Sequence, residues 1–329
     1  MKHTMRMRRI CKVAVSLALG LVFVTPAFPQ GNENNDWQAI EDQRDARRKA
    51  ELLDSFIKKY PTSGRRPDAD FTLIDFYSEN KDYQKILQMA EDFRQRPPSA
   101  DPATKAKMFV SAMFAAASLN DIKRTVEYGD YALAADPNNF AVLYFFAAAN
   151  LPNPAKGLEY GKKAIALPKP ANIRPEVYAT QMGRLHGIVA APLFAEGKFA
   201  EAREHLEAAL KANPKDQATQ FRLAFANVNL MGAAAKAAQD ANTALIKAMS
   251  ATPPNNSEAD AAKAKMESSS KEALELRDVA IESLARAIAI GGQFTQDAQK
   301  LFDGLYQAKN KSLDGATDLV AQKKSELGL

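Results

Sequence analysis

The chain is poor in the residues that build catalytic and metal-binding sites. Its 329 residues include one cysteine, three histidines and one tryptophan. Cys11 lies near the N-terminus, so the rest of the chain has no thiol for a disulfide or a metal. His186 and His205 are the only histidines beyond His3, and two histidines without a third ligand make a poor zinc site. We therefore expect no metal and no cofactor.

Motifs of nucleotide binding and hydrolysis are also missing. The sequence contains no glycine-rich phosphate loop, no H-E-x-x-H and no G-x-S-x-G. Paired carboxylates such as Glu201 and Glu204 have the spacing of solvated helix faces. We expect a non-catalytic protein, and an enzyme with an unrecognised site is the least favoured alternative.

The first 27 residues have the layout of a secretory signal peptide. Five basic residues precede an apolar run from Val13 to Val24, and Thr25-Pro26-Ala27 follows it. The run is shorter than the roughly 20 residues that a membrane-spanning helix needs. We predict cleavage after Ala27, no membrane span after cleavage, and a periplasmic or secreted protein.

The basic character of the chain comes from this N-terminal segment. The sequence has 44 basic and 39 acidic residues and a formal charge of +5. Five of the basic residues and none of the acidic ones lie within residues 1–27, which leaves 39 of each sign. A neutral mature chain gives no reason to expect nucleic acid as a partner.

The clearest structural pattern runs from Gly183 to Asp216 and predicts two helices with a tight turn at Gly197. Apolar residues recur at helical spacing on both sides of the turn, and Asn213-Pro214 ends the second helix. A helical hairpin of about 34 residues that ends in proline resembles a tetratricopeptide repeat. The residues that fill the pattern are His186, Val189, Ala190, Leu193, Ala202, Leu206 and Pro214.

The second-helix signature of this hairpin recurs along the chain. Its last members are Phe56, Phe93, Ala132, Ala164, Ala209, Ala248 and Ala287, and each precedes a proline or glycine stop. We expect an all-α, right-handed solenoid of about six such hairpins. The expected boundaries are a disordered linker over 28–35, a repeat array over 36–292 and capping helices over 293–329.

Two stretches leave the helix count open. Trp37 to Tyr60 contains no turn residue, so it is compatible with one long helix or a degenerate first hairpin. Ser257 to Ile290 has only Ser268-Ser269-Ser270 as a break, so it is compatible with one helix or two.

The resemblance implies that the first helices of the hairpins line a concave groove that binds a protein or peptide partner. The aromatic residues at these positions are Phe71, Phe114, Tyr144, Phe221 and Phe225, and the small residues among them include Ala148, Gly187 and Ala191. Some members of the family hold a terminal carboxylate with lysine and asparagine at such positions, but here the positions are mostly apolar. The alternative is that these rings pack within the protein itself.

We therefore expect an exported protein-interaction scaffold. The alternative is a structural adaptor held at the inner membrane by an uncleaved signal.

Overall fold

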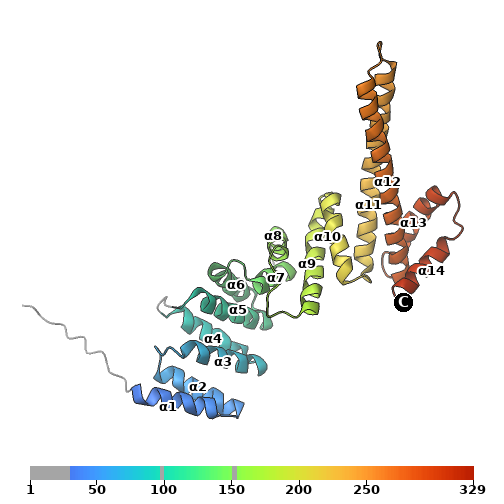
Figure 1. The fold of residues 1–329 in the computed structure, drawn as a ribbon. Helices are drawn as coiled ribbons and strands as arrows, with labels where there is room; N and C mark the ends of the chain where they lie inside the picture. The colour runs from blue at the N-terminus through green and yellow to red at the C-terminus, as the bar shows by residue number, and fades with distance from the viewer. Residues whose placement is uncertain (1–29, 97–99, 150–153) are drawn as a thin grey trace, which may run out of the picture. The chain divides into compact units, whose positions relative to one another are not determined.

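A computed structural model describes residues 30–96, 100–149 and 154–329, and the described part of the chain is entirely helical apart from turns and loops (Figure 1). This confirms the all-α prediction. The chain divides into two compact units, residues 1–82 and 83–329, which we describe separately.

The first unit contains α1 (Gln30–Asp42), α2 (Ala46–Lys59) and α3 (Arg66–Glu79). Residues 37–60 thus form two helices rather than one. The carboxylate of Asp36 on α1 accepts hydrogen bonds from Lys59 at 2.7 Å and Tyr60 at 2.8 Å. Glu33 accepts one from Ser63 at 2.6 Å. Of the linker expected over 28–35, residues 30–35 belong to α1, and residues 28–29 lie outside the described part of the chain.

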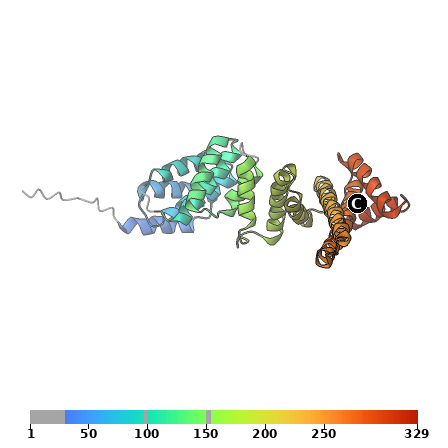
Figure 2. The ribbon, with the colours of Figure 1, turned by 90° about the horizontal axis from the view of Figure 1, so that it is seen from above.

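The second unit contains eleven helices among its described residues (Figures 1 and 2). They are α4 (Tyr83–Arg94), α5 (Pro102–Ser118), α6 (Ile122–Ala135), α7 (Phe140–Ala148), α8 (Pro154–Ile165), α9 (Pro175–Ala195), α10 (Phe199–Ala212), α11 (Gln217–Ser250), α12 (Asn256–Ile290), α13 (Thr295–Asn310) and α14 (Ala316–Glu326). Successive helices pack as the pairs α5/α6, α7/α8, α9/α10 and α11/α12.

Aspartate and asparagine side chains cap the N-termini of several of these helices. Asp101, Asp121, Asn139, Asp216 and Asn255 each accept a hydrogen bond from the backbone N–H three residues ahead. Such caps satisfy backbone donors that have no partner inside the helix. The pattern explains why helix starts can be read from the sequence.

The turn between α9 and α10 has the predicted geometry. Gly197 adopts a φ of +73°, a left-handed conformation that glycine reaches without a steric penalty. Lys198 N–H donates to the Leu193 carbonyl at 2.9 Å, which closes the end of α9. Val189, Leu193, Ala202 and Leu206 then form one buried cluster between the two helices.

The α11/α12 pair differs from our expectation. We expected residues near Phe221 and Ala248 to belong to two helices of one hairpin, but α11 runs through both without a break. Gly232 is the one glycine inside it, and a single glycine among alanines costs only about 1 kcal/mol. Residues 257–290 likewise form a single helix, α12.

Buried residues recur every seven positions along this pair. On α11 they include Ala234, Ala241 and Ala248, and on α12 they include Ser269, Leu276 and Ser283. A seven-residue period is typical of helices that pack as a coiled coil. At the start of α11, Gln217 donates to the Ala287 carbonyl at 3.3 Å and accepts from the Phe294 N–H at 3.3 Å.

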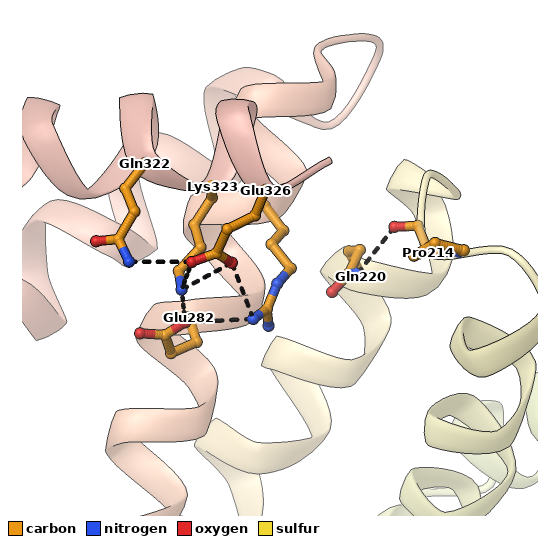
Figure 3. Close-up of polar contacts among 7 residues, drawn as sticks. Pro214, Gln220, Glu282, Gln322, Lys323 and Glu326 are labelled. Atoms are coloured by element: carbon orange, nitrogen blue, oxygen red, sulfur yellow. Dashed lines mark hydrogen bonds and ion pairs between the residues drawn. The ribbon is translucent and has the colours of Figure 1, made fainter. Parts of the chain in front are cut away.

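The two C-terminal helices pack on α12, where Phe302 is fully buried beside Ile281 and Leu284. Figure 3 shows Lys323 of α14 between Glu282 of α12 and Glu326. Lys323 is 5% exposed, and its Nζ lies 2.6 Å from Glu282 Oε2 and 2.9 Å from Glu326 Oε1. Burial alone would lower the pKa of Lys323, but the hydrogen bonds to both carboxylates outweigh it and raise the pKa.

Candidate partner-binding groove

Four of the five aromatic residues assigned to the groove contact another ring of the protein. In the second unit, Phe114 lies 5.5 Å from Phe145, Tyr144 6.2 Å from Phe140, Phe221 5.0 Å from Phe294, and Phe225 5.6 Å from Phe194. Phe71 is half-buried on α3 in the first unit. None of the ring contacts among the described residues joins two of the four residues in the second unit.

Their exposure differs from residue to residue. Phe114 and Phe225 are 40% and 37% exposed, whereas Tyr144 and Phe221 are half-buried against apolar clusters. The role of these aromatic residues in binding stays a prediction.

A hollow of about 620 Å³ lies instead beside the small residues of the expected groove. It is lined by parts of five consecutive helices, from α7 to the start of α11, and we call it the α7–α11 groove. Its lining residues are Phe146, Ala147, Ala148, Gly157, Leu158, Thr180, Gly183, Arg184, Gly187, Ile188, Ala191, Pro192, Ala209, Ala212, Asn213, Asp216, Thr219 and Arg222. Ala148, Gly187 and Ala191 were expected at the concave face, and all three line the groove.

Two glycines on α9 have different physical roles. A Cβ on Gly183 would overlap the Cβ of Ala212, so the close contact of α9 with α10 needs glycine there. A Cβ on Gly187 would meet no atom within 4 Å. Packing therefore does not require glycine at 187, and any larger side chain there would stand beside the hollow.

Two arginines line the groove without a partner. Arg184 on α9 is exposed and Arg222 on α11 is half-buried. Neither guanidinium takes part in an ion pair or hydrogen bond with any described residue. The one carboxylate in the lining, Asp216, already accepts the Thr219 N–H at 3.0 Å as the cap of α11.

We missed these arginines in the sequence because we considered only the positions that the repeat pattern assigns to the groove. Arg184 lies three residues before Gly187, which places both on neighbouring positions of one helix face. That spacing is the signal that points to Arg184. Arg222 has no such signal, because only the packing of α11 against α9 and α10 brings it to the groove.

The two histidines of the α9/α10 hairpin are in direct contact. His186 Nδ1 and His205 Nδ1 lie 2.8 Å apart, so one nitrogen donates the single shared proton and the other accepts it. Burial lowers the pKa of both imidazoles. The neighbouring His205 further lowers the pKa of His186, and Lys162 further lowers that of His205. Within the described ranges, no group of three or more potential ligand residues is placed to hold a metal ion.

A second hollow of about 500 Å³ lies between α12, α13 and α14, but its charged groups already have partners. Asp278 pairs with Lys309 at 3.1 Å, and Glu282 pairs with Arg286 at 3.4 Å. It offers a ligand no uncompensated charge, so the α7–α11 groove is the better candidate site.

Among the helices that the structure describes, none combines the length and the apolar character needed to cross a bilayer. No family model matches the chain, and comparison with curated proteins finds no significant similarity. The tetratricopeptide resemblance therefore rests on the repeat pattern alone.

Proposed function

We propose that the protein is an exported, non-catalytic scaffold with a right-handed, tetratricopeptide-like repeat array that binds a protein or peptide partner. The observation that carries the proposal is the α7–α11 groove, which joins an apolar, small-residue lining to two arginines without partners. Binding grooves of proteins commonly combine an apolar lining with a few polar groups that fix orientation. Stacked helical hairpins commonly use such a surface for recognition.

Export rests on the N-terminal segment of residues 1–27. In the alternative, the same segment stays attached and holds a structural adaptor at the inner membrane. Intact mass of the protein recovered from cells separates the two proposals. Loss of about the first 27 residues, the length of a typical signal peptide, would eliminate the anchored adaptor.

The groove is tested by filling it. Gly187→Met places a long side chain at an open position and removes a helix-weakening glycine, so the fold should tolerate it. Gly304→Met on α13 is the matched control, because an added Cβ there also meets no atom within 4 Å. The probe is a displayed library of random peptides, each long enough for about five helical turns.

We expect peptides enriched on the unsubstituted protein to bind the Gly304→Met variant equally well and the Gly187→Met variant at least about tenfold more weakly. Equal binding to all three proteins, or no enrichment at all, would reject the groove as the binding site. Circular dichroism of the variants confirms that each one is folded.

A further inference from the structure

We infer that the α7–α11 groove takes an acidic helical segment of its partner, with carboxylate side chains on Arg184 and Arg222. This inference rests on the proposed function and adds the chemical class of the partner. It is carried by the charge of the groove and by the small size of the residues that line its floor.

The charge comes from two guanidinium groups on different helices. Arg184 lies on α9 and Arg222 on α11, and both line the same hollow without a carboxylate partner. Asp216 adds one negative charge, but its Oδ1 already accepts a backbone N–H at 3.0 Å. Guanidinium groups form their strongest hydrogen bonds with carboxylates, so acidic side chains are the natural complement.

The floor of the groove favours a helix. Gly187 and Ala191 are four residues apart and so lie one above the other on α9, while Ala147, Ala148 and Gly157 add small residues from α7 and α8. Small residues at a contact let two helix backbones approach closely. A helix binds such a groove through side chains at i, i+3, i+4 and i+7.

Shape and charge together define the partner. One face of its helix carries small or medium apolar residues toward α9. Aspartate or glutamate residues flank that face and reach the two arginines. A basic or uncharged helix would leave both guanidinium groups without an anionic partner beside the bound chain.

The peptide selection tests this composition directly. We expect the peptides that lose binding in Gly187→Met to be rich in aspartate and glutamate at helical spacing. We also expect proline in the middle of such a peptide to abolish binding, because proline interrupts a helix. Enriched peptides that require Gly187 but are neutral or basic would overturn the inference and leave the proposed function intact.

Reversing the charges on both sides then tests whether the two arginines pair with the acidic residues of the peptide. The double variant Arg184→Glu, Arg222→Glu should bind an enriched acidic peptide at least about tenfold more weakly. It should regain affinity for the same peptide with lysine in place of its acidic residues. The control, Lys236→Glu with Lys300→Glu, changes the net charge equally at exposed positions outside the groove.

The control variant should keep most of the affinity, and added salt should weaken binding to the unsubstituted protein because exposed charges are screened. Equal losses in both double variants would show only a general effect of net charge. Failure of the lysine peptide to regain affinity would likewise reject direct pairing with Arg184 and Arg222.

Discussion

At the scale of single residues, two glycines of one helix have different structural roles because their surroundings differ. Gly183 and Gly187 are one helical turn apart on α9 and look alike in the sequence. Gly183 sits against Ala212, whereas the space beside Gly187 is open. Gly183 is needed for the packing of α9 on α10, whereas Gly187 leaves open space in the α7–α11 groove.

Alanine substitution should separate these two roles. Gly183→Ala forces a methyl group into Ala212, and overpacking of this kind typically costs about 1–3 kcal/mol. Gly187→Ala meets nothing and should stabilise the helix by up to about 1 kcal/mol. Denaturant melts measure both changes. Equal effects would show that α9 does not pack on α10 as described.

The histidine pair should make stability depend on pH. Both imidazoles have folded-state pKa values below the ordinary 6.5, so the unfolded chain binds protons more readily as the pH falls. The contribution of the two neutral histidines to the free energy of unfolding is therefore fully present above about pH 6.5. It declines as the pH falls below about 6.5 toward the lowered folded-state pKa values. Glu201, Glu204 and Lys162 also act on His205, with the carboxylates opposing the shift.

Denaturant melts at about pH 7.5 and 5.5 should show this decline, with an upper limit of about 1.4 kcal/mol for each histidine over one pH unit below 6.5. The double variant His186→Gln, His205→Gln should show a smaller decline. An unchanged decline in that variant would mean that other groups cause it. Metal content should be the same in both proteins.

At the scale of helices, the α9/α10 hairpin was predictable and the α11/α12 pair was not. Gly197 and Pro214 mark the turn and the end of α10 in the sequence, so local chemistry fixes those boundaries. No comparable break separates Phe221 from Ala248, and the repeated small-residue pattern suggested a hairpin where α11 is continuous. The period of seven favours a coiled coil, but it resembles the repeat signature over short windows.

The α9/α10 contact supplies a direct test of the repeat register. Ala202 is fully buried against α9, and Ala200 is exposed in the same turn of α10. Ala202→Leu should destabilise the protein by about 1–3 kcal/mol, and Ala200→Leu should change its stability little. Thermal melts of the two variants provide the comparison. If the melting temperatures fall equally, the register of α10 is wrong.

The docking of α14 should depend on Lys323. Replacing it with methionine removes a buried cation that two carboxylates share, together with its charged hydrogen bonds to both. Because Glu282 and Glu326 are partly exposed, water compensates part of this loss. We expect faster hydrogen exchange in α14 of Lys323→Met, and no change in Lys324→Met at the exposed neighbouring position. Equal exchange in both variants would show that Lys323 does not hold the helix.

At the scale of the whole molecule, the candidate site combines what sequence could and could not predict. The repeat pattern led to Ala148, Gly187 and Ala191 because it assigns faces of individual helices. Arg222 could not be found this way, because its place in the same groove as Arg184 depends on how α11 packs against α9 and α10. The aromatic positions were assigned by face alone, without knowledge of the rings that meet them.

Stability should also differ along the second unit. The buried positions of α11 beyond Ala234 are alanines, which bury little apolar surface compared with Leu193 and Leu206 in the α9/α10 hairpin. Amides near Ala241 and Ala248 should therefore exchange faster than those near Ala202, as measured by native-state hydrogen exchange. Slower amide exchange near Ala248 than near Ala202 would show that something other than the buried alanines protects this part of α11.

The arrangement of helix pairs in the second unit has a consequence for how the chain folds. The helices that pack closely are neighbours or next-but-one neighbours along the chain, as in α5/α6, α9/α10 and α12/α14. Local contacts of this kind close short loops, so their entropic cost is low and they form fast. A chain synthesised from its N-terminus can thus complete α5/α6 and α9/α10 before its last helices are made. The hydrogen bond between Gln217 and Ala287 spans 70 residues, so it can form only after α12 has packed against α11.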